Sequence, residues 1–113
     1  MPAKRIVFYT FGSLGDLFPI VALARELKRR GHTAVVATSP AHRGRVEAAG
    51  VEFHSLRPDI APLDPEMLRR AMDLRHGTRY IVCEMILPYL RQTFEDSVAA
   101  ARGADLQIGR AHV

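Results

Sequence analysis

The segment Gly12-Ser13-Leu14-Gly15-Asp16 brings two glycines, a hydroxyl and a carboxylate close together in the chain. Glycine has no Cβ, so the backbone can turn sharply here and approach a bound group closely. The N–H groups at the start of a following helix can bind an anion. The segment therefore predicts either a tight turn or a phosphate-binding loop.

The elements around this loop are typical of a parallel sheet. Arg5–Thr10 is an unbroken apolar run, which suits a strand buried on both faces. The loop follows this strand, and ligands of open α/β sheets bind at the carboxyl ends of strands. A helix is predicted next, with Pro19 in its first turn and Gly31 at its end. Its predicted apolar face is formed by Ile20, Leu23, Ala24 and Leu27.

The same alternation of elements continues along the chain. Thr33–Thr38 predicts a second buried strand, and Ser39 with Pro40 predicts the capped start of a short helix that runs to about Ala49. Val51–Leu56 alternates like a third strand. The order β-α-β-α-β indicates an α/β fold with a Rossmann-like parallel sheet and flanking helices.

The second half of the chain is predicted to be mainly helical. After the proline-rich connection Arg57–Pro65, one helix is expected from Asp64 to about His76, with a break at Gly77. A longer helix is expected from Thr78 to Arg102, kinked near Pro88. Cys83 is expected to pack in the core. Ala104-Asp105-Leu106 reads as the entry to a fourth strand that is not completed.

The final segment, Gln107–Val113, is suspect. Ile108 to Val113 match one reading frame of a widely used DNA-sequencing adapter, and the adapter's first bases could complete a codon for Gln107. Our hypothesis is that residues 107–113 are a non-native tail, and that residues 1–106 are a partial domain of a longer protein.

Length, composition and charge exclude several classes of function. The chain has 113 residues and a net charge of +4. Its basic residues are scattered without interleaved aromatics, so no nucleic-acid partner is expected, whereas contact with an anionic membrane surface stays open. No apolar run approaches the ~18–20 residues of a membrane span, and the N-terminus lacks a signal-peptide layout, so we expect a cytoplasmic protein. No Cys/His cluster has zinc-site spacing, so no metal is expected.

The loop also argues against a dinucleotide cofactor. It reads G-x-x-G-D rather than G-x-G-x-x-G, and Thr38-Ser39 stands where a ribose-binding carboxylate would follow the second strand. NAD or FAD is therefore not expected.

The stretch from Gly12 to Leu56 resembles the N-terminal domain of bacterial nucleotide-sugar glycosyltransferases of the GT-B fold. The similar branches are the sterol and antibiotic glucosyltransferases and the rhamnolipid rhamnosyltransferases. The matching positions are Gly12, Ser13, Gly15, Asp16, Pro19, Ala22, Leu23, Ala24, Leu27, Arg30, Gly31, His32, Ala37, Thr38, Val46, Glu47, Ala49, Gly50, Val51 and Phe53.

This resemblance implies two facing Rossmann-like domains, of which the chain is an incomplete, acceptor-side N-terminal half. The donor-binding C-terminal domain is then absent, and the fragment alone is inactive. The implied reaction is an inverting transfer of a hexose from a nucleotide sugar to a hydroxyl of a lipophilic or small-molecule acceptor. Asp16 matches the proposed catalytic base, and Gly12, Ser13 and Gly15 face the substrate diphosphate. The nucleotide sugar is a co-substrate, and no metal or other cofactor is implied.

Alternatives remain for the loop and for the whole chain. An aspartate just before a helix is also an ordinary N-cap, and capping lowers the pKa of a carboxyl, which weakens a base. The chain could instead be a stand-alone flavodoxin-like binding or regulatory module. It could also resemble the N-acetylglucosaminyltransferase of the peptidoglycan lipid precursor, although Asp16 argues against that. His32 is expected to be structural. A further set is expected to be mostly core, with some members lining an apolar acceptor pocket: Met67, Leu68, Met72, Met85, Ile86, Tyr89 and Leu90.

Overall fold

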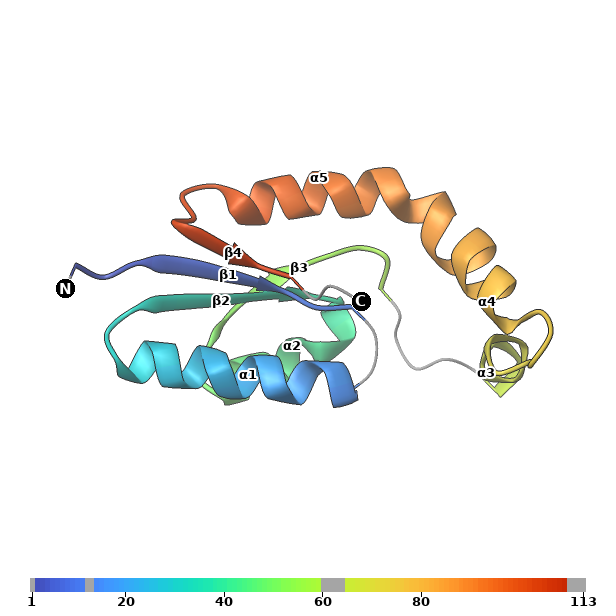
Figure 1. The fold of residues 1–113 in the computed structure, drawn as a ribbon, viewed down its shortest axis with the longest axis horizontal. Helices are drawn as coiled ribbons and strands as arrows, with labels where there is room; N and C mark the ends of the chain where they lie inside the picture. Colours follow the sequence, from blue (N-terminus) through green and yellow to red (C-terminus); the bar gives the residue numbers. More distant parts are fainter. Residues whose placement is uncertain (1, 12–13, 60–64, 110–113) are drawn as a thin grey trace.

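The computed structural model describes residues 2–11, 14–59 and 65–109, and the molecule is elongated, measuring 50 × 27 × 25 Å (Figure 1). Gly12 and Ser13 of the glycine loop lie outside the described residues. In the parts of the chain that the structure describes, no helix combines the length and the apolar character needed to cross a bilayer.

Four parallel strands form one sheet in the order β3-β2-β1-β4. Their bounds are Arg5–Tyr9 for β1, Thr33–Thr38 for β2, Glu52–Ser55 for β3 and Leu106–Ile108 for β4. The first three strands confirm the prediction, which rested on apolar runs for β1 and β2 and on alternation for β3. The strand order reverses at β1, which pairs with β2 on one side and with β4 on the other.

The strand β4 corrects the expectation that a fourth strand is begun but not completed. Leu106 pairs with Ile6, and Gln107 and Ile108 continue the ladder beside Val7 and Phe8. Backbone pairing needs only a free neighbouring strand, and a run of three residues with one polar side chain between two apolar ones was too short to predict it. This pairing leaves the origin of Gln107–Val113 a hypothesis.

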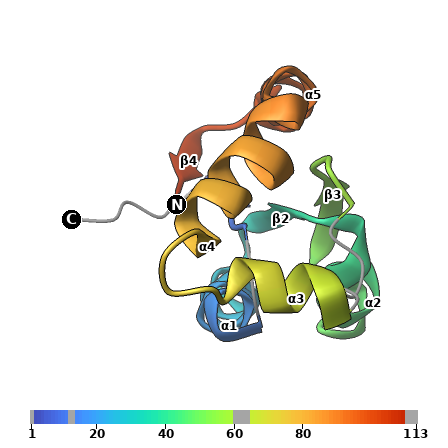
Figure 2. The ribbon, with the colours of Figure 1, turned by 90° about the vertical axis from the view of Figure 1, so that its right-hand side faces the viewer.

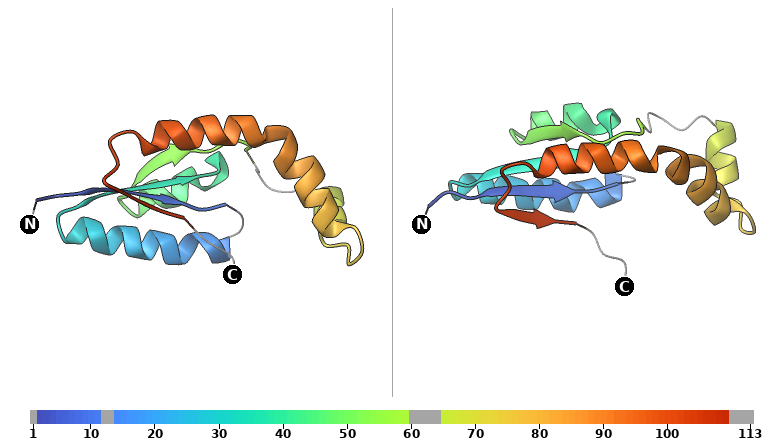
Figure 3. Two further views of the ribbon diagram at one scale, coloured as in Figure 1. Left: turned by 45° about the horizontal axis from the view of Figure 1, so that its top comes forward. Right: turned by 90° about the horizontal axis from the view of Figure 1, so that it is seen from above.

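Helices cover both faces of the sheet (Figures 1 and 3). One face carries α1 (Leu14–Arg29) and α2 (Arg43–Ala48), and the other carries α5 (Leu90–Ala101). A 3-10 turn, η1 (Pro40–His42), leads into α2, and the Ser39 hydroxyl accepts a hydrogen bond from the Ala41 N–H at 3.4 Å. The predicted cap at Ser39 is therefore confirmed.

The end of α1 depends on a glycine. Gly31 has a φ of +93°, a left-handed conformation that side chains with a Cβ rarely adopt. Its N–H donates to the Lys28 carbonyl at 3.0 Å, and the His32 N–H donates to the Leu27 carbonyl at 3.1 Å. These bonds close the helix and turn the chain directly into β2.

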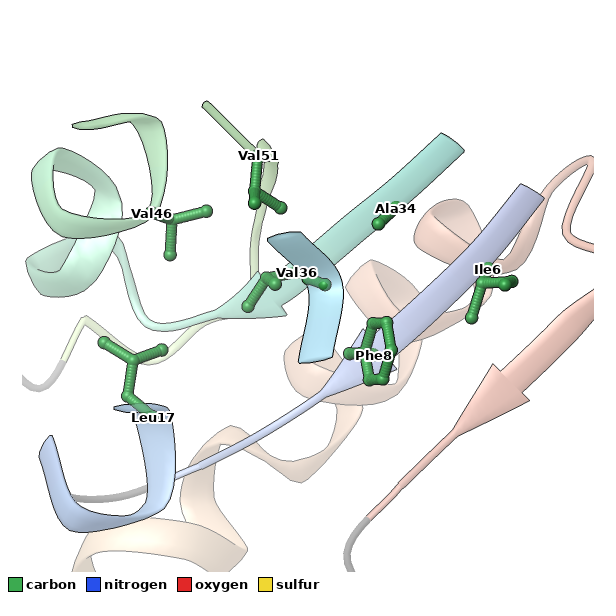
Figure 4. Packing of buried hydrophobic residues seen from close by; sticks show 8 residues of the cluster. Ile6, Phe8, Leu17, Ala34, Val36, Val46 and Val51 are labelled. Atoms are coloured by element: carbon green, nitrogen blue, oxygen red, sulfur yellow. The ribbon is translucent and has the colours of Figure 1, made fainter. Parts of the chain in front are cut away.

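Alternation along the strands builds two apolar layers. Ile6, Phe8 and Val36 point toward α1 and α2, where they pack with Leu17 and Val46 (Figure 4). On the other face Val7, Val35 and Ala37 pack with Leu56 and with Ala100 of α5. The side chains of both layers are almost completely buried, so the sheet is fixed between its helices.

The helical half is more broken than the sequence predicts. It comprises α3 (Pro65–Ala71), α4 (Gly77–Tyr80), a π-helical segment η2 (Ile81–Ile86), a 3-10 turn η3 (Leu87–Tyr89) and then α5. The predicted kink near Pro88 is confirmed by η3. Gly77 opens α4 rather than only ending the preceding helix, and α3 ends at Ala71 instead of near His76.

Several side chains are more exposed than the helical pattern predicts. Cys83 is exposed, and Leu23, Leu68, Met72 and Leu90 are all at least half exposed. An apolar stripe shows which face of a helix is apolar, but something must still cover that face. The expectation of a core position was therefore wrong for Cys83, Leu68 and Met72, whereas Leu90, like Ile86, lines a cavity, as was expected of some members of this set.

Candidate functional site

A cavity of about 570 Å³ lies at the carboxyl ends of β1, β3 and β4, below the helix α5. This volume falls in the range of small-molecule pockets. The cavity lies near β1, which has β2 on one side and β4 on the other. This is the switch point at which open α/β sheets bind ligands. Its lining residues are Tyr9, Thr10, Phe11, Leu56, Pro58, Ile86, Leu90, Thr93, Ser97, Gln107 and Gly109.

The lining combines apolar walls with a few polar groups. Leu56, Ile86 and Leu90 supply apolar surface, while Thr93 and Ser97 present hydroxyls from one face of α5. This composition suits an apolar molecule with a small number of hydroxyl groups.

Tyr9 links three elements beside the cavity. Its hydroxyl lies 3.2 Å from the Ser97 carbonyl oxygen in α5 and 3.0 Å from Oε1 of Gln107 in β4, so its single proton can donate to either acceptor. Burial raises the pKa of the Tyr9 hydroxyl. The side chain therefore stays neutral and acts as a hydrogen-bond donor that holds α5 to the sheet.

A charged pair beside the cavity also holds α5 in place. The Arg57 N–H donates to Oδ2 of Asp96 at 2.8 Å, and its guanidinium donates to both carboxylate oxygens at 2.9 and 3.0 Å. The hydrogen bonds from Arg57 lower the pKa of the Asp96 carboxyl. Asp96 is thus held ionised in a structural pair, where it joins the end of β3 to α5 and is unsuited to acid–base catalysis.

A hydroxyl reinforces the same junction. Thr93 donates from Oγ1 to the Arg57 carbonyl and also lies 3.1 Å from the Tyr89 carbonyl oxygen. Because Thr93 lines the cavity as well, the Arg57–Asp96 pair fixes the position of a cavity wall.

The structure places the predicted loop residues differently from the sequence analysis. The helix α1 begins at Leu14, so Gly15 and Asp16 lie in its first turn, and Pro19 lies within the helix rather than in that turn. Asp16 is half-buried at the third helical position, which corrects the expectation that it precedes the helix as an N-cap. A carboxylate at this position is stabilised by the positive end of the helix dipole.

Asp16 and the cavity lie at the same end of the domain. Among the described residues, however, Asp16 is not part of the cavity lining. The cavity lining includes Thr10 and Phe11, which precede the loop, but it does not include Gly15 or Asp16. Gly12 and Ser13 lie outside the described residues. The role of Asp16 as a base therefore stays a prediction.

The sequence analysis missed Tyr9, Thr93 and Ser97 as site residues, whereas Gln107, which also lines the cavity, belongs to the segment that we hypothesise to be non-native. Tyr9 looked like part of a buried apolar strand. Thr93 and Ser97 are four residues apart, so they share one face of a helix, and a polar pair on the sheet-facing side was the available signal. His32 is structural as expected, because its Nδ1 accepts from the Lys4 N–H at 3.1 Å at the other end of the sheet.

The described residues hold no group of three or more His, Cys, Asp or Glu side chains that could bind a metal ion.

A parallel sheet with helices on both faces and a ligand-sized cavity at its switch point defines an α/β domain of the Rossmann type. Residues 6–103 match the glycosyltransferase family 28 N-terminal domain. The match covers most of the chain, and the chain belongs to this family.

The curated proteins that are similar to this chain include several sugar transferases. A sterol 3-beta-glucosyltransferase of Arabidopsis thaliana is 38% identical over 69 residues, which cover 61% of this chain and 11% of that protein. The O-mycaminosyltylonolide 6-deoxyallosyltransferase of Streptomyces fradiae is 40% identical over 76 residues, which cover 63% of this chain and 18% of that protein. An uncharacterized glycosyltransferase of Mycobacterium tuberculosis is 32% identical over 107 residues, which cover 90% of this chain and 26% of that protein.

Solved structures show the same fold. The calicheamicin glycosyltransferase CalG4 aligns with a TM-score of 0.68 at 23% identity, over 96% of this chain and 27% of that one. The glycosyltransferase SsfS6 of Streptomyces sp. SF2575 aligns with a TM-score of 0.64 at 24% identity, over 94% of this chain and 33% of that one. The chain therefore corresponds to the N-terminal domain of a GT-B glycosyltransferase and spans a third or less of these relatives.

Proposed function

We propose that this chain is the acceptor-side part of an inverting glycosyltransferase that moves a hexose from a nucleotide sugar to a hydroxyl of a lipophilic or small-molecule acceptor. The observation that carries this proposal is the apolar cavity with hydroxyl-bearing side chains at the switch point of a family 28 domain. The names of two relatives, a sterol 3-beta-glucosyltransferase and an O-mycaminosyltylonolide 6-deoxyallosyltransferase, support an acceptor of this chemistry.

In this proposal the cavity holds the acceptor so that one hydroxyl points toward the glycine loop and a donor bound by the remainder of the protein. Apolar contacts with Leu56, Ile86 and Leu90 would exclude water, and Thr93 and Ser97 would orient polar groups of the acceptor. A positioned base lowers the barrier by taking the hydroxyl proton as the new bond forms. Asp16 is the candidate for that base.

The leaving diphosphate would be stabilised by backbone N–H groups around Gly12, Ser13 and Gly15 and by the start of α1, without a metal or another cofactor. The nucleotide sugar is then a co-substrate. We further propose a cytoplasmic enzyme with peripheral contact to the inner face of the membrane, where a lipophilic acceptor is concentrated. On this proposal the separate chain binds acceptor but transfers no sugar.

Acceptor binding can be tested on the chain itself. Leu90→Glu places a carboxylate on the apolar wall, while Phe94→Glu makes the same change on an exposed position of α5 outside the cavity lining. Titration with a fluorescent sterol should show binding that Leu90→Glu weakens at least tenfold and Phe94→Glu leaves unchanged. Equal effects of the two substitutions, or no binding by the unaltered chain, would refute the acceptor site.

The catalytic role of Asp16 needs the whole protein, recovered by reading the gene outward from the codon for Leu106. Asp16→Asn should lower turnover at least ~100-fold, the low end for a lost general base. Glu47→Gln, on the exposed side of α2, serves as the matched control. Unchanged turnover of Asp16→Asn would remove Asp16 from the mechanism and leave it a residue of the first helical turn.

A further inference from the structure

Besides the cavity, the structure has a second notable feature, the α3–α4 hairpin, which we define as residues 65–84. It lies beyond the carboxyl ends of the strands and projects from the sheet (Figures 1 and 2). Its segment η2 leads into the cavity wall, because Ile86 at the end of η2 lines the cavity. The hairpin therefore stands at the same end of the domain as the proposed acceptor site.

The turn of this hairpin presents apolar side chains to the outside. Leu74 is 103% exposed and Met72 is 72% exposed, the highest values among the large apolar side chains of the described residues. Leu68, one helical turn before Met72, is half exposed. Such a group of exposed apolar side chains indicates an interaction surface.

The turn is held in a defined shape. Oδ1 of Asp73 accepts hydrogen bonds from the Arg75 N–H at 2.9 Å and the His76 N–H at 2.8 Å, and the Gly77 N–H donates to the Asp73 carbonyl at 2.8 Å. Gly77 is buried against α3, where an added Cβ would lie 2.4 Å from the Ala71 carbonyl oxygen. Leu74 is therefore exposed by the local fold.

Basic side chains surround this apolar turn. A cavity of about 320 Å³ between the two helices is lined by Arg70, His76, Arg79, Tyr80, Cys83 and Glu84. The three acidic residues of the hairpin are already engaged. Glu66 pairs with Arg69 at 2.7 Å, Glu84 pairs with Arg70 at 3.1 Å, and Asp73 accepts from the turn.

Two arginines of the hairpin are available to bind an external anion. Arg75 and Arg79 form no ion pair with the described residues, and both follow the exposed apolar turn in the chain, Arg75 directly after Leu74 and Arg79 four residues later. Apolar side chains next to unpaired basic groups match the surface of an anionic bilayer, where the apolar groups enter the acyl boundary and the arginines meet phosphates.

We propose that the α3–α4 hairpin docks the domain on an anionic phospholipid bilayer. Met72 and Leu74 enter the interface, while Arg75 and Arg79 contact lipid phosphates. This arrangement would hold the acceptor cavity next to the membrane from which a lipophilic acceptor partitions. The inference refines the membrane contact in the proposed function, but vesicle binding requires no sugar transfer, so the two proposals fail separately.

The test is co-sedimentation of the chain with vesicles of phosphatidylcholine alone or with 30% phosphatidylglycerol. Met72→Ser/Leu74→Ser removes the apolar turn, and Arg75→Gln/Arg79→Gln removes the charges. Leu23→Ser/Phe94→Ser removes two exposed apolar side chains elsewhere and is the matched control. Far-UV circular dichroism of every variant, and sedimentation without vesicles, exclude unfolding and aggregation as causes.

The chain should bind the anionic vesicles preferentially. The apolar variant should bind both vesicle types at least tenfold more weakly, whereas the charge variant should lose about tenfold on anionic vesicles only, since each basic residue near such a surface adds to binding. The control should bind like the unaltered chain. Absence of binding to anionic vesicles, equal binding to both vesicle types, or equal losses in the hairpin and control variants would overturn the proposal and leave the hairpin as a surface for protein contacts.

Discussion

The pair between Arg57 and Asp96 makes a quantitative prediction for the substitution Asp96→Asn. The Asp96 carboxylate accepts three hydrogen bonds from Arg57, at 2.8, 2.9 and 3.0 Å, and its side chain is only 18% exposed. Asparagine keeps an oxygen for the Arg57 N–H but removes the charge. The comparison therefore measures the charged part of the pair alone.

The expected loss follows from the difference between charged and neutral hydrogen bonds. Charge-assisted bonds contribute about 1.5–3 kcal/mol, against about 0.5–1.5 kcal/mol for neutral ones. The Arg57 side chain is 47% exposed, so water screens the pair and the lower part of the range applies. We expect Asp96→Asn to lower the free energy of unfolding by about 1 kcal/mol, which lowers Tm by about 4 °C in a domain of this size.

The pH dependence identifies the cause of this loss. The pKa of Asp96 is lowered from its usual value of 3.8 in the folded chain, so the pair stabilises fully above that value and loses its contribution as the pH falls below it. The difference in Tm between Asp96→Asn and the unaltered chain should be complete at pH 7 and should shrink markedly at pH 3.

Thermal unfolding followed by circular dichroism at both pH values is the assay. Glu95→Gln is the control, since Oε2 of Glu95 lies 3.7 Å from the Arg57 guanidinium and its side chain is 58% exposed, so its loss should change Tm very little. A difference in Tm that is the same at pH 3 and pH 7, or an equal loss in Glu95→Gln, would refute the reasoning.

Three further substitutions test other parts of the fold. Tyr9→Phe removes the hydroxyl that joins α5 to β4, and urea denaturation should show a loss of about 1 kcal/mol; no loss would mean that this bridge does not stabilise the fold. Gly77→Ala forces α3 away from α4, so limited proteolysis should cut this region faster, and unchanged cleavage would contradict the close contact. Val36→Ala removes two methyl groups from a fully buried position beneath α1 and should cost about 2 kcal/mol in the same urea assay, whereas a cost near zero would place Val36 outside the core.

The sheet was largely predictable from the sequence because its strands are short apolar runs between glycine-marked turns. Thr33–Thr38 illustrates this, since five of its six residues are buried and both faces of the strand are covered. An apolar run that is buried on both faces is typical of a strand inside a parallel sheet, which is why Thr33–Thr38 was predicted to pair with Arg5–Tyr9. The order of the first five elements followed from the same pattern.

The start of α1 and the surroundings of the helical half were harder to predict. Pro19 suggested a first turn, but the helix tolerates it as its sixth residue at the loss of one backbone hydrogen bond. Leu68 and Phe94 occupy apolar positions, yet the residues that would cover them are not encoded in their own helices. The cavity was missed for a related reason, because Tyr9 and Gln107 meet through pairing of strands about 100 residues apart.

That long separation between β1 and β4 has a consequence for how the chain folds. The partner of β1 in β2 follows within one helix, so these two strands can associate while the remainder is still being synthesised. The contact with β4 closes a loop of about 100 residues, which carries a larger entropic cost. We therefore expect β1 to pair with β2 before it pairs with β4, so that the part of the cavity between β1 and β4 is completed only when β4 joins the sheet.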